Sequence, residues 1–157
     1  MLKVGFIGLG TMGFPIAGHI SQSYETAVFN RTTNKSQKWA SEFKGEVCES
    51  IKDLALKSNV IFLCLSEDKD IEEIILGSDG IMEHLNEETI VVDHSTTSVD
   101  TATLISNELL KKDSIFLDAP VSGGEVGAKN GTLSVMIGGD DLAYKQISPI
   151  LDCYSAF

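Results

Sequence analysis

Three glycines near the start of the chain could hold a phosphate group against bare backbone. Gly8, Gly10 and Gly13 separate an apolar strand-like run from an apolar helix-like run, with the spacing Gly-x-Gly-x-x-Gly. In dinucleotide-binding loops the first glycine permits a tight turn and the second lets a pyrophosphate approach the backbone. The third lets the helix pack closely on the strand. A glycine-rich turn that binds nothing is the alternative. The strand before and the helix after favour the loop, and the predicted cofactor contacts are Gly8, Leu9, Gly10, Thr11, Met12 and Gly13.

The residues that follow the second predicted strand indicate which dinucleotide is preferred. A carboxylate at this position usually accepts hydrogen bonds from the adenosine ribose of NAD, but here the sequence reads Asn30-Arg31-Thr32. A carboxylate would repel a 2′-phosphate, whereas the planar cation of Arg31 can pair with one. Asn30 and Thr32 would add neutral donors. The sequence therefore predicts NADP, with NAD less favoured, although a solvated surface arginine is the alternative.

These residues require a particular arrangement of strands and helices. Apolar runs alternate with amphipathic segments, which predicts parallel strands joined by helical crossovers. We expect an α/β fold, a Rossmann-like doubly wound, mainly parallel sheet with helices on both faces. Predicted strands cover residues 3–8, 26–30, 59–65, 89–95, 115–120 and 133–139, and residues 46–48 form a strand or a loop. Predicted helices cover 12–22, 34–43, a segment beginning at Ser50, 98–111 and the stretch from 140 onward.

Composition excludes several classes of protein. The chain has 157 residues and a formal net charge of −11, which disfavours broad binding to nucleic acid or to an anionic membrane. No apolar run approaches the length of about 20 residues that spans a bilayer. Cys48, Cys64 and Cys153 are widely spaced, which indicates reduced thiols in a cytoplasmic protein rather than a metal site or a disulfide framework. We therefore expect no nucleic-acid partner, no membrane association and no bound metal.

Four longer motifs make the chain resemble the β-hydroxyacid dehydrogenases, the family of 3-hydroxyisobutyrate dehydrogenase and of the tartronate, glyoxylate and succinic semialdehyde reductases. They are GFIGLGTMGFPIA (5–17), NRT (30–32), DHST (93–96) and DAPVSGGEVGAKNGTLSVMIGG (118–139). The resemblance covers nearly the whole chain. It implies that Thr96 contacts the cofactor near the nicotinamide, and that Leu65 and Ser66 lie beside it, although relatives often have proline at position 66.

The same resemblance implies a substrate site after the fifth predicted strand. Ser122, Gly123 and Gly124 follow Asp118-Ala119-Pro120 at the carboxyl edge of the sheet, where ligands bind in doubly wound folds. The serine hydroxyl and exposed N–H groups could hold the carboxylate of a small acid or semialdehyde. A flexible turn between strands is the alternative interpretation.

No catalytic residue is predicted within this chain. The family's acid/base lysine lies in a GxGxxxKxxxN pattern, which is not found in these 157 residues. Lys129 is expected to be a solvated loop residue. His94 is expected to be a neutral imidazole packed at a strand end, with a role in proton transfer left open. His19 and His84 show no chemical signal.

The resemblance therefore implies a dinucleotide-binding domain over residues 1–157 that lacks a helical catalytic and dimerisation domain. The parent enzyme is expected to be a homo-oligomer, and the chain alone to bind NADP with negligible turnover. We also expect the last helix to expose apolar surface where the other domain would pack.

Three alternatives remain open from the sequence. 6-Phosphogluconate dehydrogenase shares NRT and a similar glycine-rich loop, but Thr132-Leu133 and Ile137 depart from its usual pattern. Imine reductases share the dinucleotide half but usually lack DAPVSGG. A non-enzymatic interaction module with the same fold is the third alternative.

Overall fold

The main sheet has six parallel strands with helices on both faces. The computed structural model describes residues 1–156. The strand order is β3-β2-β1-β4-β5-β6, which is the doubly wound order with its switch point between β1 and β4. The strands are β1 (Val4–Ile7), β2 (Thr26–Phe29), β3 (Glu46–Val47), β4 (Val60–Leu63), β5 (Ile90–Asp93) and β6 (Ile115–Asp118). This arrangement confirms the predicted fold class, and residues 46–47 form the outer strand.

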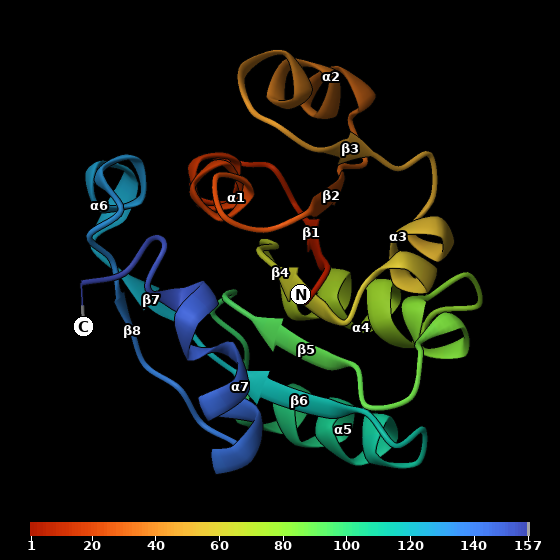
Figure 1. The fold of residues 1–157 in the computed structure, drawn as a ribbon. Helices are drawn as coiled ribbons and strands as arrows, with labels where there is room; N and C mark the ends of the chain where they lie inside the picture. The colour runs from red at the N-terminus through yellow and green to blue at the C-terminus, as the bar shows by residue number, and fades with distance from the viewer. Residues whose placement is uncertain (157) are drawn as a thin grey trace.

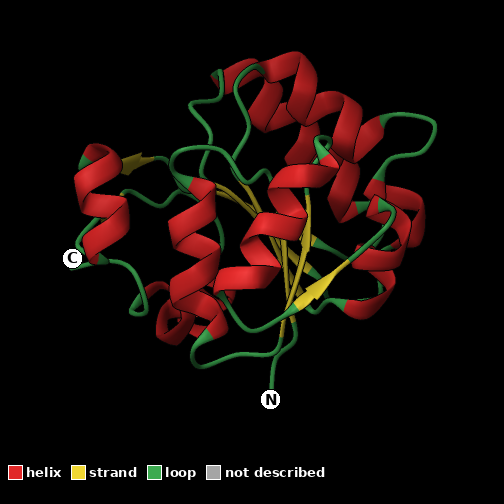
Figure 2. Ribbon diagram, turned by 90° about the horizontal axis from the view of Figure 1, so that it is seen from above, coloured by secondary structure: helices red, strands yellow, loops and turns green. Residues whose placement is uncertain are grey.

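Helices cover the two faces of the sheet in two groups. They are α1 (Gly13–Ser21), α2 (Thr33–Glu42), α3 (Ile51–Lys57), α4 (Asp68–Leu76), α5 (Val99–Leu110), α6 (Gly124–Asn130) and α7 (Asp141–Leu151), with a 3-10 turn η1 (Ile81–His84). Figure 1 shows α1, α6 and α7 on one side of the sheet and α3, α4 and α5 on the other. Figure 2 shows the strands enclosed between helices when the molecule is seen from above.

Alternate residues of the same strands build a separate core on each face. Phe6 and Phe62 lie in the core under α1 and stack with ring centroids 6.0 Å apart. Ile7 and Leu63 lie in the core under α3, α4 and α5. Because both faces of the central strands are buried, their sequences are continuously apolar, as is typical of parallel sheets.

The structure corrects the prediction for residues 133–139. Only β8 (Ser134–Val135) is a strand there, and it pairs antiparallel with β7 (Val121–Ser122) in a separate two-stranded sheet. The run reaches the main sheet only at an isolated antiparallel bridge between Asp118 and Gly138. The helix α6 joins β7 to β8, so the run returns antiparallel to β7 and adds no further strand to the main sheet.

Two helices are not indicated by the sequence patterns described above. In α4, the buried Ile71 and Ile75 lie one turn apart, but acidic and basic residues surround them. The helix α6 contains Gly124 and Gly127, which have low helix propensity. Lys129 therefore lies on a helix rather than in a loop.

The last helix buries one face and exposes the other, as predicted. Ile147 and Ile150 of α7 are fully buried, whereas the side chain of Leu142 is 74% exposed. The three cysteines are unbridged; Cys48 is buried, and Cys64 and Cys153 are half-buried. Within residues 1–156, no helix is both long and apolar enough to cross a bilayer.

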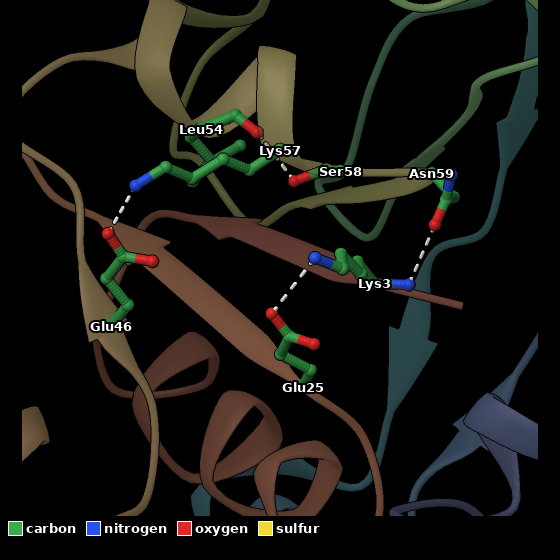
Figure 3. A network of polar contacts seen from close by, with 7 residues as sticks. All are labelled: Lys3, Glu25, Glu46, Leu54, Lys57, Ser58 and Asn59. Atoms are coloured by element: carbon green, nitrogen blue, oxygen red, sulfur yellow. Dashed lines mark hydrogen bonds and ion pairs between the residues drawn. The ribbon is translucent and has the colours of Figure 1, made fainter. Parts of the chain in front are cut away.

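The amino ends of the strands are held by exposed polar contacts (Figure 3). The Lys3 ammonium lies 3.3 Å from a Glu25 carboxylate oxygen, and the Lys3 N–H donates to the Asn59 side chain at 2.9 Å. Lys57 pairs with Glu46. These groups border a hollow of about 530 Å³ at this edge of the sheet.

Candidate functional site

The glycine loop after β1 depends on the absence of side chains at two positions. Gly8 has a φ of +100°, and a Cβ there would lie 2.2 Å from the carbonyl oxygen of Cys64 on the neighbouring strand. A Cβ at Gly13 would lie 1.9 Å from the Gly8 oxygen. No heavy atom would lie within 4 Å of a Cβ at Gly10. Gly8 and Gly13 are therefore required by the turn itself, whereas Gly10 leaves its surface open to a ligand.

Backbone donors at this loop have no partner within the protein. Among residues 1–156, no acceptor is within hydrogen-bond range of the N–H groups of Gly10, Thr11 and Met12. They precede α1, whose N-terminus carries a partial positive charge. Such a loop is suited to bind a phosphate or pyrophosphate.

Asn30 joins this loop to the segment after β2. Its side-chain oxygen accepts a hydrogen bond from the Leu9 N–H at 2.8 Å, and its side-chain nitrogen donates to the Thr32 carbonyl at 3.1 Å. The amide group therefore holds the glycine loop and the Arg31–Thr32 turn in a fixed relation. The sequence does not indicate this bracing role.

A cleft of about 390 Å³ brings together residues from three strand ends. Of the predicted cofactor contacts, its lining includes Gly8, Gly10, Asn30, Arg31, Thr32, Leu65 and Ser66. Lys35, in the first turn of α2, also lines the cleft and was not predicted, although it lies four residues after Arg31. The Arg31 side chain is 76% exposed, and its guanidinium nitrogen lies 3.9 Å from an Asp70 carboxylate oxygen. The cleft therefore offers two cations beside unpaired backbone donors.

Leu9 and Thr11 do not line this cleft. They lie with Gly10 around a neighbouring hollow between α1, α2 and α6. Met12 is half-buried and packs against the core, so that only its backbone remains available as a donor.

A buried carboxylate fixes the loop that carries Thr96. Asp93 ends β5 and is fully buried; one of its oxygens accepts from the Ser95 N–H at 2.9 Å, and the other accepts from the Thr97 hydroxyl. The Ser95 hydroxyl accepts from the Leu65 N–H at 2.8 Å, which ties this loop to the end of β4. Thr96 is exposed between two restrained neighbours. Burial raises the pKa of Asp93, and the hydrogen bonds from Thr97 and Ser95 oppose that rise.

His94 is buried and hydrogen-bonded through both ring nitrogens. Its Nδ1 lies 2.6 Å from the Ala119 carbonyl oxygen and its Nε2 lies 2.6 Å from the Tyr154 hydroxyl. A carbonyl can only accept, so Nδ1 carries the proton and Nε2 accepts from the tyrosine. Burial lowers the pKa of His94 to about 4, and the ring is neutral near pH 7. The same environment raises the pKa of the Cys64 thiol to about 11, chiefly through burial.

The predicted substrate residues start α6. Ser122 ends β7 and is exposed, Gly123 has a φ of +132° and Gly124 has a φ of +63°. At the other end of this helix, the His19 ring nitrogen Nε2 lies 3.0 Å from the carbonyl oxygens of Ala128 and Lys129. His19 therefore ties α6 to α1, a role that no sequence pattern indicates.

Two further features limit the chemistry that these residues can perform. Lys129 pairs with Glu125 at 2.7 Å on the surface of α6. Asp118, at the end of β6, has a buried side-chain oxygen without a hydrogen-bond partner among residues 1–156. Burial raises its pKa, and Asp93 adds to that rise.

Among residues 1–156 no cluster of three or more His, Cys, Asp or Glu side chains could hold a metal ion. Thr96 and Ser122 do not line the cleft around Arg31.

Comparisons with known proteins agree with this geometry. The family model for the NAD binding domain of 6-phosphogluconate dehydrogenase matches residues 3–157. An oxidoreductase of Shewanella frigidimarina whose function is uncharacterised is 42% identical over 99% of this chain and 54% of its own length. The 2-hydroxy-3-oxopropionate reductase of Escherichia coli is 30% identical over 96% of this chain and 51% of its own length.

Solved structures show the same similarity. The 3-hydroxyisobutyrate dehydrogenase of Mycobacterium tuberculosis, solved with L-serine, has a TM-score of 0.91 at 26% identity and covers 99% of this chain. Psf3 in complex with NADP+ and 2-OPP has a TM-score of 0.92 at 30% identity and covers 98%. This chain covers 52% of the first structure and 54% of the second, and it spans about half the length of the curated relatives. The chain belongs to the NAD-binding domain family of 6-phosphogluconate dehydrogenase, among relatives that include 3-hydroxyisobutyrate dehydrogenase and 2-hydroxy-3-oxopropionate reductase.

Proposed function

We propose that this chain is the coenzyme-binding half of an oxidoreductase that transfers hydride between NADP(H) and a small β-hydroxyacid or semialdehyde. Residues 1–157 form the dinucleotide-binding domain in this proposal. A second, helical half supplies the catalytic acid/base and the main contacts between subunits. The proposal is supported by the family match and by relatives about twice as long as this chain.

The preference for NADP is carried by Arg31 and Lys35 at the cleft that also contains Gly8 and Gly10. NAD-binding sites usually have a carboxylate at the end of β2, where this chain has Asn30, and both polar side-chain atoms of Asn30 bond to backbone. A guanidinium can pair with the 2′-phosphate through two parallel hydrogen bonds. The similarity to Psf3, which was solved with NADP+, supports the same choice.

The remaining contacts follow from the positions of the loops. The N–H groups of Gly10, Thr11 and Met12 would hold the pyrophosphate. Leu65, Ser66 and Thr96 would lie along the nicotinamide half, because they end β4 and β5 at the same edge of the sheet. The bound coenzyme supplies or accepts the hydride, and the protein orients it.

Ser122, Gly123 and Gly124 would hold the carboxylate of the substrate. These three residues are exposed around the start of α6, beyond the carboxyl end of β6. Neither His94 nor Lys129 is placed to act as the acid/base. His94 uses both ring nitrogens in buried contacts, and Lys129 pairs with Glu125.

The decisive experiment titrates the protein with NADP+ and NAD+ separately and repeats both titrations with Arg31→Asp. We expect NADP+ to bind more tightly to the wild type by about tenfold or more, because charge-assisted hydrogen bonds contribute about 1.5–3 kcal/mol. The substitution should abolish that preference. Lys52→Asp, which changes an exposed residue of α3 by the same charge, should retain it. Equal affinities in the wild type, or an unchanged ratio in Arg31→Asp, would contradict the proposal.

Turnover tests the division of labour between the two halves. Purified residues 1–157 should bind NADPH but reduce glyoxylate or succinic semialdehyde negligibly. Reduction at a rate typical of an enzyme, at least about 1 s⁻¹, would place the acid/base within this half and overturn that part of the proposal.

A further inference from the structure

The cleft that holds Arg31 also contains two carboxylates. Asp70 and Glu73, both on α4, line it together with Arg31 and Lys35. The formal charges of these four side chains cancel. A cleft that receives a doubly charged 2′-phosphate thus contains its own competing anions, and this determines how strongly it can select for that phosphate.

Asp70 differs from the other carboxylate in the first turn of α4. Asp68 accepts hydrogen bonds from the Ser98 N–H at 3.1 Å and from the Thr101 hydroxyl at 3.3 Å, and these bonds hold α4 against α5. No hydrogen-bond donor among residues 1–156 reaches the Asp70 carboxylate. Its side chain is 22% exposed, and its nearest cation is the Arg31 guanidinium at 3.9 Å. Asp70 lies in the first turn of α4, where the helix dipole favours a carboxylate, and it has no hydrogen-bond donor of the kind that binds Asp68.

We propose that Asp70 is a specificity-determining residue that limits selectivity for a 2′-phosphorylated dinucleotide over the unphosphorylated one. Its carboxylate competes with the 2′-phosphate for the Arg31 guanidinium and repels that phosphate across the cleft. This inference rests on the proposed function, because it concerns the same cleft and the same ligand class.

The direction of the effect follows from the relative size of two contributions. Asp70 could help by holding Arg31 over the cleft, but the Arg31 side chain is 76% exposed and the two charges are 3.9 Å apart, so the pair stabilises a side-chain position weakly. The phosphate carries nearly two negative charges and would lie against the same guanidinium, so that repulsion and competition both act against binding. Repulsion outweighs positioning, and removal of the Asp70 charge should favour NADP+.

The test measures dissociation constants of NADP+ and NAD+ for the wild type, Asp70→Asn and Asp79→Asn. Asp79 is an exposed carboxylate beyond the C-terminus of α4, and its substitution matches the charge change away from the cleft. We expect Asp70→Asn to tighten NADP+ binding about three- to fivefold and to change NAD+ binding less than about twofold. Asp79→Asn should change neither.

Salt dependence separates this mechanism from a structural one. The gain in Asp70→Asn should be largest at about 0.01 M salt and should nearly vanish at about 1 M, where the Debye length is about 3 Å. Glu73→Gln should act in the same direction. A weaker affinity for NADP+ in Asp70→Asn, an equal change for both dinucleotides, or a gain that persists at high salt would overturn the inference. If the wild type binds neither dinucleotide, the proposed function itself fails, and the two outcomes are thereby distinguished.

Discussion

The two edges of the sheet carry different kinds of polar groups. At the amino edge, Lys3 and Lys57 are paired with Glu25 and Glu46 on the surface. At the carboxyl edge, the backbone donors of residues 10–12 have no partner, and two glycines adopt or support a turn that no other residue could form. The side chains at the amino edge are thus paired with one another, whereas the N–H groups of residues 10–12 at the carboxyl edge find no partner among residues 1–156.

The size of a hollow does not distinguish the two edges. The hollow at the amino edge has a volume of about 530 Å³ and the cleft around Arg31 about 390 Å³. What differs is the supply of unpaired donors and the approach of bare backbone. The larger volume therefore does not by itself indicate a binding site, and the proposed site is the smaller cleft, beside the unpaired donors.

The sharpest test compares two glycines of the same loop. Gly13→Ala should cost roughly 3–5 kcal/mol of unfolding free energy, because its Cβ would overlap the Gly8 carbonyl oxygen at 1.9 Å. Gly10→Ala meets no atom within 4 Å, so its stability should change by less than about 1 kcal/mol. It should nevertheless weaken dinucleotide binding about tenfold or more, since the added methyl group lies where the pyrophosphate approaches. Urea denaturation and ligand titration measure the two effects, and equal stability losses would remove the distinction.

Acid should lower the free energy of unfolding through His94, which directly follows β5 at the carboxyl edge of the sheet. The pKa of this buried ring falls from 6.5 to about 4, and burial is the main cause. At pH values between about 4 and 6.5, this ring therefore binds a proton in the unfolded chain but not in the folded chain. The stability that the neutral ring gives the folded state is fully present above pH 6.5 and is lost as the pH falls toward 4. The loss is up to about 3 kcal/mol, at about 1.4 kcal/mol per pKa unit.

A variant isolates that contribution from other groups. The raised pKa values of Asp93 and Asp118 act in the opposite direction, because their folded forms retain protons longer. His94→Gln cannot titrate, so unfolding free energies of this variant and the wild type should diverge between pH 4 and 6.5. Parallel pH profiles for His94→Gln and the wild type would show that the ring is not responsible.

The smallest effect is expected at the amino edge. Glu25→Gln removes the exposed partner of Lys3 and should change the unfolding free energy by less than about 1 kcal/mol. It should leave NADP+ affinity unchanged. Calorimetry measures both quantities, and a measurable loss of coenzyme binding would mean that the two edges are not independent.

The central fold could be predicted because local and global signals agree. The apolar runs at 26–29 and 60–63 are strands buried on both faces, and the glycine spacing occurs where a strand meets a helix. The antiparallel course of 133–139 could not be predicted, because an apolar run does not itself indicate the direction in which it pairs. The helix α6 was missed because Gly124 and Gly127 disfavour a helix that tertiary contacts nevertheless hold.

The candidate site was predictable in its residue types and less so in its connections. Arg31, Thr32, Leu65 and Ser66 do meet at one cleft with Gly8 and Gly10. Lys35 lies in the first turn of α2, and the sequence motif 30–32 does not extend to it. The contacts of Ser95 and His19 join residues that are 30 and 109 positions apart in the sequence, and no local pattern indicates such contacts.

The amide of Asn30 has a consequence for how coenzyme choice can evolve. The Asn30 side chain bonds the backbone of both the glycine loop and the adjoining turn, whereas the side chains of residues 31, 32 and 35 take no part in these two bonds. We therefore expect that substitutions at residues 31, 32 and 35 change the ligand contacts and leave the two hydrogen bonds of Asn30 in place. A protein with this loop could thus change its preferred dinucleotide through a few surface substitutions, provided that Asn30 is retained.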